Sequence, residues 1–459
     1  MLNPAVLLAD DVIADLRRRE FARLDAARVA YLDYAGAALY ADSQIASHAA
    51  RLGGLVLGNP HSEHDASLAS TEIIERARKH VRRFFDAGDE YVVCFTANAS
   101  AAIKLVAEAY PFGADAPLVL TADNHNSVNG MREYARRAGA AVEYLPLNAS
   151  LRLDSPERRL AEAGPAFGPR GNRSAPLFAF PAQSNFSGVQ HALSLIYTAQ
   201  SLGYRVLLDA AAFVAAHPLS LRTHPADFVA ISFYKMFGYP TGVGALLARR
   251  DALASLRRPW FAGGTIDYAS VQLQRHQMRP LHEAYEDGTP NFLDIAAIED
   301  GLALIDAVGL ARIAGHTSEL AQVLIDGLTA LRHSTGEALA RVYGVGDDRG
   351  ATVTFNVLDR EGRPVPFGLV EHRANGARVQ LRGGCFCNPG AAEAAFGFDA
   401  RQMAGCLDAL GADFSIPRLQ QCVGRDVAVG AVRASIGLAN NRRDIERCLD
   451  VVASFGTRA

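Results

Sequence analysis

Lysine is scarce in this sequence, which carries almost all of its positive charge on arginine. Arginine and lysine together number 46 among 459 residues, and only three of these are lysines, at positions 79, 104 and 235. An arginine is effectively always protonated and cannot form an imine with an aldehyde, whereas a lysine amine can once its pKa is lowered. Each of the three lysines is therefore a candidate for chemistry that arginine cannot perform.

Long apolar runs are absent as well. No run reaches the roughly 18 residues that a membrane-spanning helix needs. Residues 1–24 lack a basic start and a long apolar centre and are interrupted early by acids, which predicts an amphipathic helix and not a signal peptide. The net charge of −3 gives no reason to expect nucleic acid or an acidic membrane surface as a partner.

Cysteine is also sparse, with six in the whole chain. So few cysteines in so long a chain do not form a disulfide scaffold, and a reducing, cytoplasmic compartment is the simplest interpretation. A hydrophobic content of 49% and a charged content of 21% are ordinary for a soluble globular protein. A chain of this length can form two or three lobes, each with its own core.

Strand-like and helical patterns alternate between residues 90 and 250. Helical patterns occupy residues 100–110, 127–139 and 193–203. Such alternation predicts βαβ units around a mostly parallel, buried sheet. The strand-like runs are "EYVVCFT", "APLVLTA", "AAVEYLPL", "APLFAFPA", "YRVLLDAA" and "DFVAISF".

The rest of the chain predicts a second, smaller α/β lobe. A long helical pattern at residues 291–309 leads into it, and the Pro- and Gly-rich residues 162–176 predict a surface excursion within the larger lobe. We expect three parts: an N-terminal segment (1–45) that packs on the small domain, a large domain (46–295) and a small C-terminal domain (296–459).

The three lysines lie in different settings. Lys79 is in a helical pattern with charges on one face, which predicts a solvated side chain, and Lys104 lies a few residues inside another helix. Lys235 follows a strand-like run and precedes the Gly-rich "FGYPTGVGALL". The ends of strands in α/β sheets are where such proteins place their chemistry. By its position alone Lys235 could still be a surface lysine in a loop, so its role has to be judged from other residues.

Two further segments suit a pyridoxal phosphate site, which needs an imine-forming lysine, a carboxylate for the pyridine nitrogen and a phosphate cradle. Asp209 ends a strand in "VLLDAAAF" and would keep the ring nitrogen protonated. "CFTANASAAIKL" joins a strand to a helix through a small-residue turn with Asn98 and Ser100, a geometry that holds phosphate. Ser100 could equally be a simple helix cap.

Polar residues follow two more strands. His125 comes just after one strand in "TADNHNSV", and Gln183 and Asn185 follow the next in "FPAQSNFSG". One such residue in a loop is usually structural. Polar groups after one strand end upon another predict a shared site, because parallel strands end at the same edge of a sheet.

With these residues, the sequence resembles a fold-type I, class V aminotransferase-like enzyme of the cysteine desulfurase group, closest to the desulfurase domain of molybdenum-cofactor sulfurases. The resemblance implies an α/β fold with a seven-stranded-type, mostly parallel sheet and a smaller α/β domain that carries a cysteine loop. It covers residue 31 to about 440 and rests on "YLDYAGAALY", "GNPHSEHDAS", "FTANASAAIKLVAE", "FPAQSNFSG", "LLDAAAFV", "SFYKMFGYPTGVGALL", "EDGTPNFLDI", "LRGGCFCNPGA" and "VRASIGL".

The resemblance implies pyridoxal 5′-phosphate as the cofactor, bound in the large domain, and assigns roles to individual residues. Lys235 would form the imine and move protons, His125 would stack on the ring, and Arg433 would grip the substrate carboxylate with a bidentate fork. Thr265 would reach the phosphate of a neighbouring subunit, which implies a homodimer. The remaining cofactor contacts would be Asp209, Asn98, Ala99, Ser100, Gln183, Asn185, Ser232 and Tyr234, with Asn185 also near the substrate.

Two cysteines form the C-x-C of "GGCFCNPGA". They could be buried small hydrophobes or half of a metal site, but zinc normally requires a second pair, and none is visible. The Gly-rich setting predicts an accessible, mobile loop whose thiolate acts as a nucleophile. The resemblance assigns the persulfide to Cys387 and makes Cys385 a resolving or relay thiol. The other cysteines are interpreted as structural: Cys94, Cys406, Cys422 and Cys448.

Several positions depart from the pattern of the group. Tyr34 stands where the molybdenum-cofactor branch usually has His, and Ala392 replaces a third cysteine. Ala212 and Tyr234 stand where bacterial iron–sulfur desulfurases have Gln and His, which favours the molybdenum-cofactor branch. The sequence ends at residue 459, where molybdenum-cofactor sulfurases continue into an acceptor domain. The expected sulfur acceptor is therefore a separate partner protein, a small sulfur carrier or a biosynthetic intermediate.

The function predicted from the sequence is conversion of L-cysteine, or a related sulfur amino acid, to alanine with a persulfide on Cys387. One alternative is another class V pyridoxal enzyme, such as a C–S β-lyase, an epimerase or a transaminase, that does not use Cys387. A second is a non-catalytic persulfide carrier. The joint presence of Lys235, Asp209, His125 and Arg433 argues against a carrier.

Overall fold

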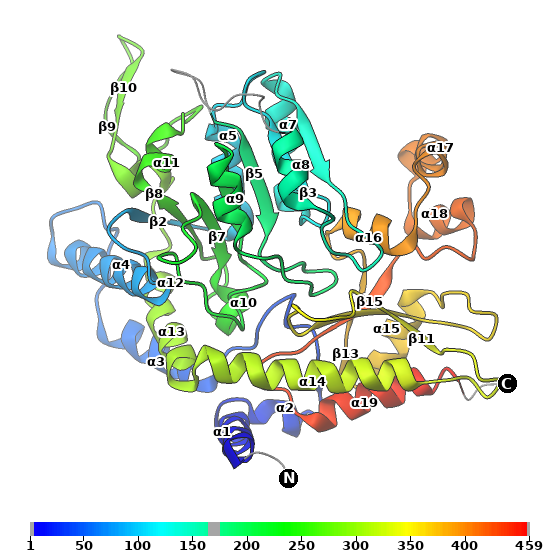
Figure 1. Cartoon of the computed structure of the whole chain (residues 1–459). Coiled ribbons are helices and arrows are strands. Elements are labelled where there is room, and N and C mark those ends of the chain that lie inside the picture. The colour runs from blue at the N-terminus through cyan, green and yellow to red at the C-terminus, as the bar shows by residue number, and fades with distance from the viewer. Residues whose placement is uncertain (1–3, 164–174, 457–459) are drawn as a thin grey trace.

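The computed structural model describes residues 4–163 and 175–456, with side chains from residue 12 onward. The larger lobe is an α/β sandwich, and the smaller lobe lies against it, with the long helix α14 (Leu310–Ala330) running along its base (Figure 1). Most of the surface excursion predicted at 162–176 lies outside the described residues. Within the described part of the chain, no helix has both the length and the apolar character to cross a membrane.

The large lobe is built on one seven-stranded sheet of order β2-β8-β7-β6-β5-β3-β4. Only β8 runs against its neighbours, so the prediction of a mostly parallel seven-stranded sheet is confirmed. All six predicted strands are present; β8 was not predicted, because a short apolar run after a Gly-rich turn shows no period. The strands are β2 (Tyr91–Thr96), β3 (Leu118–Thr121), β4 (Val142–Leu145), β5 (Leu177–Pro181), β6 (Arg205–Asp209), β7 (Phe228–Ser232) and β8 (Gly244–Arg249).

Both faces of this sheet are buried. In β5, Phe178 and Phe180 belong to one core, while Leu177 and Ala179 belong to the core on the opposite face. Successive side chains of a strand point to opposite faces, so a strand covered on both sides reads as a continuous apolar run. The helices and hairpin strands around this sheet are α3 (Asp42–Gly54), α4 (Asp65–Phe84), α5 (Ala99–Ala109), α6 (Asn126–Asn129), α7 (Met131–Arg137), α8 (Pro156–Ala163), α9 (Leu195–Ser201), α10 (Phe233–Phe237), α11 (Arg250–Ser255), β9 (Ile266–Ser270), β10 (Arg275–Met278) and the 3-10 helix η1 (Leu281–Tyr285).

The small lobe has its own four-stranded antiparallel sheet of order β11-β12-β15-β14 and its own core. The helical pattern at 291–309 is not one helix, since it breaks between α12 and α13. Both of these helices, α12 (Phe292–Ile295) and α13 (Ile298–Val308), pack against the core of the large lobe. The elements that follow α14 are β11 (Ala340–Tyr343), β12 (Thr352–Val357), α15 (Phe367–Gly376), β13 (Val379–Gln380), β14 (Arg382–Gly384), α16 (Pro389–Phe396), α17 (Ala400–Leu410), η2 (Gly411–Asp413), α18 (Ile416–Val423), β15 (Ala431–Ser435) and α19 (Arg442–Ala453).

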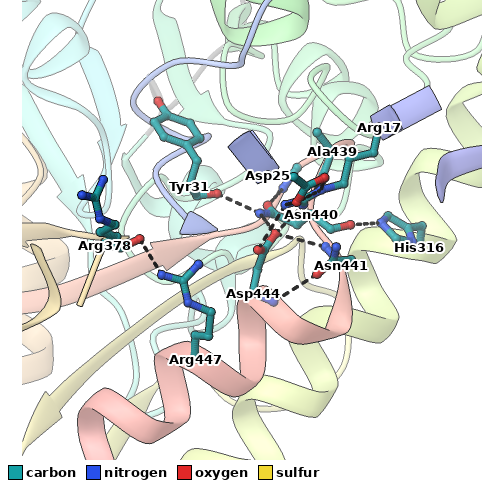
Figure 2. A network of polar contacts seen from close by, with 11 residues as sticks. Arg17, Asp25, Tyr31, His316, Arg378, Ala439, Asn440, Asn441, Asp444 and Arg447 are labelled. Atoms are coloured by element: carbon teal, nitrogen blue, oxygen red, sulfur yellow. Dashed lines mark hydrogen bonds and ion pairs between the residues drawn. The ribbon is translucent and has the colours of Figure 1, made fainter. Parts of the chain in front are cut away.

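The N-terminal segment is fixed to the small lobe by a buried arginine (Figure 2). Arg17, in the last turn of α1 (Pro4–Glu20), donates to the Ala439 carbonyl at 2.5 Å and to Asp444 at 2.7 Å. It also pairs with Asp25 of the short helix α2 (Ala22–Ala26). The two-residue strand β1 (Ala30–Tyr31) then pairs in parallel with β13. These contacts join part of residues 1–45 to the C-terminal part of the chain, while the division into three domains with these boundaries stays a prediction.

The helices α17 and α18 form a small helical pair that projects beside α16 (Figure 1). A disulfide joins Cys406 of α17 to Cys422 of α18, so the prediction of reduced cysteines is wrong for this pair. The reason is tertiary: the two helices pack on each other and bring the Cα atoms to 5.9 Å, within the range that a disulfide spans. Cys94 and Cys448 are free and buried.

Candidate active site

Residues far apart in the sequence meet at the carboxyl edge of the large sheet. Asp209 ends β6, Ser232 ends β7 and Lys235 follows three residues later in α10, while His125 lies in the loop after β3. The charged groups that act on the Lys235 amine include Asp209, Arg433 and Cys387, and each is close enough to shift its pKa. The structure therefore brings these predicted residues together, and their joint function as a cofactor site stays a prediction.

Lys235 is suited to imine chemistry because its surroundings favour the neutral amine. Burial lowers its pKa below the ordinary value; Asp209 acts in the opposite direction, and the positive charge of Arg433 lowers it further. By contrast, Lys104 is exposed and pairs with Glu108 at 2.6 Å, which raises its pKa. Lys79 is exposed on α4. Lys235 alone among the three has the environment of a reactive amine.

The turn between β2 and α5 forms a small-residue cradle. Asn98 caps α5, because its Oδ1 accepts a hydrogen bond from the Ala101 amide at 3.0 Å. The Ser232 hydroxyl accepts from the Ala99 amide at 2.8 Å and so ties the turn to the end of β7. Gly244 of β8 lies so close that an added Cβ would stand 2.6 Å from the Asn98 Cα.

Ser100 faces the loop after β3. Its exposed hydroxyl lies 2.5 Å from the hydroxyl of Ser127. This brings two hydroxyls to the N-terminal end of α5, where amide groups and the helix dipole favour an anion. Ser127 was not predicted, since a serine inside a helical pattern carries no signal of its own.

His125 caps the short helix α6 in the same loop. Its Nδ1 accepts a hydrogen bond from the Ser127 amide at 3.1 Å, which requires an unprotonated nitrogen. Burial lowers the pKa of His125, with Asp209 acting against the shift and Lys235 and Arg433 adding to it. Both observations favour a neutral ring, which suits the predicted stacking of His125 on a pyridinium.

The two predicted amides after β5 are engaged with protein groups. Gln183 is buried, and its Oε1 accepts from Gln190 at 3.1 Å. Asn185 donates from Nδ2 to the Phe386 carbonyl at 2.7 Å and accepts at Oδ1 from Asn388 at 2.9 Å. Their predicted contacts with cofactor or substrate stay predictions, and Asn185 has a second set of partners that the sequence did not reveal.

Arg433 lies on β15 with only 2% of its surface exposed. Its Nη2 lies 3.1 Å from Asp33, its Nη1 donates to the Asn185 carbonyl at 3.0 Å, and its Nε has no partner among the described residues. Asp33 also pairs with Arg382 at 2.6 Å. Asp33 and Arg382 were not predicted as site residues, although both lie within motifs of the resemblance.

The C-x-C loop places its two thiols in different surroundings. Cys387 is exposed, while Cys385 is half-buried and donates to the Val429 carbonyl at 3.4 Å. Burial raises the pKa of Cys385 to about 11, so that it stays a thiol at neutral pH. Among described residues, no group of three His, Cys, Asp or Glu side chains could hold a metal ion.

Three positions that depart from the group pattern are buried or half-buried in the structure. Tyr34 is buried, its pKa is raised by that burial, and an added Cβ on Gly437 would stand 2.0 Å from the Tyr34 ring. Tyr234 is half-buried and stays protonated, because burial raises its pKa. Ala392 packs in a small cluster with Phe386.

Thr265 is the residue predicted to reach the phosphate of a neighbouring subunit. Thr265 is buried, and its hydroxyl donates to the Ala262 carbonyl at 2.8 Å and accepts from the Ala262 amide at 3.0 Å. Its contact with a neighbouring subunit stays a prediction. Ala212 lines a cavity of about 60 Å³ that also touches Lys235, and its methyl group offers no polar contact there.

The donor set fits pyridoxal phosphate. It combines a lysine amine whose pKa is depressed, a carboxylate at the neighbouring strand end, a neutral imidazole and a serine-rich helix N-terminus. The buried Arg433 adds an unpartnered Nε that could contribute to binding a carboxylate.

Comparison with known proteins agrees with this description. The family described as aminotransferase class-V matches residues 30–448. The molybdenum cofactor sulfurase of Solanum lycopersicum is 35% identical over 96% of this chain and 57% of its own length, and that of Homo sapiens is 36% identical over 83% and 45%. The chain thus spans about half the length of the curated relatives it matches.

Solved structures show the same fold. A cysteine desulfurase from Thermococcus onnurineus NA1 superposes with a TM-score of 0.78 at 23% identity, covering 96% of this chain and 97% of that one. The cysteine desulfurase CsdA from Escherichia coli superposes with a TM-score of 0.73 at 22% identity, covering 99% and 98%. The fold-type I architecture predicted from the motifs is confirmed, and the chain belongs to the aminotransferase class V family.

Proposed function

We propose that this protein is a pyridoxal phosphate-dependent cysteine desulfurase that moves the sulfur of L-cysteine, or of a related sulfur amino acid, to Cys387. The observation that carries the proposal is the exposed Cys387 thiol within the electrostatic reach of Lys235, the half-buried lysine whose pKa is depressed. Another class V pyridoxal enzyme would use the lysine without needing a cysteine there. The sulfurases and desulfurases found by comparison support the same class of reaction.

The cofactor would be held by groups that the fold already places together. Lys235 would hold its aldehyde carbon, Asp209 would keep the ring nitrogen protonated, and His125 would cover one face. Ser100 and Ser232, with backbone groups near Asn98 and Ala99, would hold the phosphate, as expected of a helix N-terminus. Bound in this way, the pyridine ring supplies an electron sink for the substrate α-carbon.

The residues of the chain would then perform three tasks. Arg433 binds the substrate carboxylate and fixes its orientation. The Lys235 amine, neutral because burial lowers its pKa, takes the proton from the substrate α-carbon and returns a proton later. The Cys387 thiolate attacks the substrate sulfur.

The sulfur transfer is balanced without any other reactant. An S–S bond forms on Cys387 as the substrate C–S bond breaks, and the electron pair of that bond stays on carbon, which is then protonated. L-cysteine and the Cys387 thiol thus give L-alanine and a Cys387 persulfide. Cys385 is protonated and directed at Val429, so it takes no part in this step.

A product assay tests the proposal. Purified protein loaded with pyridoxal phosphate is given L-cysteine and a reductant, and alanine, sulfide and pyruvate are quantified beside Cys387→Ser. We expect equimolar alanine and sulfide, and a loss of at least about 100-fold in the variant with its cofactor absorbance intact. Pyruvate and ammonia, or turnover indifferent to Cys387, would instead indicate a β-lyase or a transaminase.

The proposal extends to partners and compartment. The persulfide on an exposed residue needs a nucleophilic acceptor, which we take to be a separate protein or small sulfur carrier. A homodimer would let Thr265 complete the phosphate site of its neighbour. Four free thiols, including the two of the C-x-C loop, favour a reducing cytoplasm, and the Cys406–Cys422 disulfide is the observation against it.

A further inference from the structure

The C-x-C loop is docked on the cofactor side of the large lobe by amide groups. The Asn126 backbone N–H donates to the Cys387 carbonyl at 2.7 Å, and the Asn185 side chain donates to the Phe386 carbonyl at 2.7 Å. Asn126 directly follows His125, and Asn185 follows β5. The loop that carries the sulfur nucleophile is thus tied to the same loops that form the cofactor site.

A third residue, Asn388, completes this docking from within the loop. Its side chain is fully buried. The Nδ2 group donates to the Asp123 carbonyl at 2.6 Å and to Asn185 Oδ1 at 2.9 Å, while Oδ1 accepts from the Ala391 amide at 3.2 Å and caps α16. Both polar ends of the side chain are engaged, one inside its own segment and the other across the two lobes.

The backbone of the loop needs such restraint. Phe386 and Cys387 have φ values of 55° and 56°, the left-handed region that non-glycine residues rarely occupy and that persists only where the surroundings hold it. Two such residues in succession set the direction of the Cys387 side chain. If the carbonyls of Phe386 and Cys387 lost their hydrogen-bond donors, the backbone of the loop could relax to ordinary φ values and move the Cys387 sulfur.

The same corner also holds the substrate-binding arginine. The Arg433 guanidinium lies 4.7 Å from the centre of the Phe386 ring, and it donates to the Asn185 carbonyl. Asn185 therefore contacts Phe386, Asn388 and Arg433 at once. Through it, the position of the nucleophile is tied to the position of the carboxylate site.

We propose that Asn388 is a positioning residue for sulfur transfer: its carboxamide, together with the Asn126 N–H, holds Cys387 over the cofactor site. The inference rests on the proposed function and deepens it. The feature required for positioning is the Asn388 Nδ2 group, which donates hydrogen bonds to the Asp123 carbonyl and to Asn185 Oδ1. The oxygen that caps α16 serves only the helix, and this difference separates a positioning role from a structural one.

Two substitutions at Asn388 separate the donor from the cap. Asn, Asp and Ser are about equally good N-caps, so Asn388→Asp and Asn388→Ser keep the cap of α16 while removing the donor. We expect kcat for alanine formation to fall about 10- to 100-fold in both, since a displacement of about 1 Å costs that much. The KM for L-cysteine, the visible cofactor absorbance and its change on adding L-cysteine should stay within about twofold.

A backbone variant tests the same docking without touching Asn388. Asn126→Pro removes the N–H that bonds to the Cys387 carbonyl at the first position of α6, where proline is tolerated, and His125 before it already has the extended angles that proline requires. It should lower kcat in the same direction. Asn441→Ser, at the N-cap of α19 on the far side of the small lobe, is the matched control and should change nothing.

The outcomes distinguish this inference from the function on which it rests. If wild-type protein forms no alanine, the proposed function fails. If wild type is active and Cys387→Ser is inactive, but Asn388→Asp, Asn388→Ser and Asn126→Pro all turn over within twofold of wild type, only the positioning inference is overturned. Should an Asn388 variant fail to fold, a wild-type kcat in Asn126→Pro overturns the inference, and a loss with unchanged KM supports it.

Discussion

The small lobe contains two pairs of cysteines that differ in bonding and in surroundings. Cys385 and Cys387 stand two residues apart at the lobe boundary and are free, whereas Cys406 and Cys422 stand 16 residues apart in a projecting helical pair and form a disulfide. Hydrogen bonds from Asn126 and Asn185 hold the backbone at the first pair, where Cys387 is exposed and Cys385 is half-buried. The second pair closes a segment that has only a small apolar cluster of its own.

The comparison teaches that the chemistry of a cysteine depends on what holds its backbone. In the C-x-C loop, hydrogen-bond donors from other segments hold the backbone of Phe386 and Cys387 in the left-handed region. The two thiols of this loop differ in their exposure to solvent. In the α17–α18 pair, helix packing alone places two thiols within bonding distance. Chemical modification and substitution can test each half of this contrast.

Alkylation should separate the two thiols of the C-x-C loop most strongly. With its pKa raised to about 11, Cys385 would be only about 0.1% thiolate at pH 8, and its reactivity should rise tenfold per pH unit up to that value. We expect iodoacetamide to modify the exposed Cys387 at least about tenfold faster at pH 8, as followed by mass spectrometry of peptides. Equal rates at both positions would contradict the assigned burial of Cys385.

Removing the disulfide should affect stability and spare activity. The loop that it closes has 16 residues, for which the chain-entropy account gives about 3 kcal/mol. We expect Cys406→Ser combined with Cys422→Ser to lower the free energy of unfolding by up to this amount in urea denaturation, with alanine formation within about twofold. A loss of turnover without loss of stability would show that the helical pair serves the site directly.

The smallest effect is expected at Cys385. Its thiol is protonated and bonded to the Val429 carbonyl, so Cys385→Ala should change the rate of alanine formation by less than about threefold, mainly through the lost contact. The measurement is a steady-state assay beside wild type and Cys387→Ser. A fall as deep as that of Cys387→Ser would restore Cys385 as a relay thiol.

Much of the large lobe could be predicted from the sequence because its signals are local. Apolar runs followed by Asp209, His125 and Asn98 predict strand ends and their polar loops, and the scarcity of lysine isolates Lys235. The predictions were incomplete where the pattern of a segment was weak or fitted more than one structure. The strand β8 was missed after its Gly-rich turn, and the helical pattern at 291–309 conceals a break.

The partners of the small lobe could not be predicted in the same way. Asn388 follows Cys387 in a motif where asparagine reads as a turn or helix cap, and its bonds to Asp123 and Asn185 join segments about 200 residues or more apart. Asp33 likewise reaches Arg433 across 400 residues. Hydrogen bonds of this range leave no periodic trace in a sequence.

The sequence by itself determined the class of fold and singled out Lys235 and Cys387 as the candidate amine and thiol, because strand periodicity, residue chemistry and family motifs are local properties of a sequence. Only the tertiary structure decided which cysteines are bonded, which thiol is buried, and which amides hold the C-x-C loop. Those outcomes depend on distances and desolvation between segments that meet only after folding, and both are properties of the packed chain.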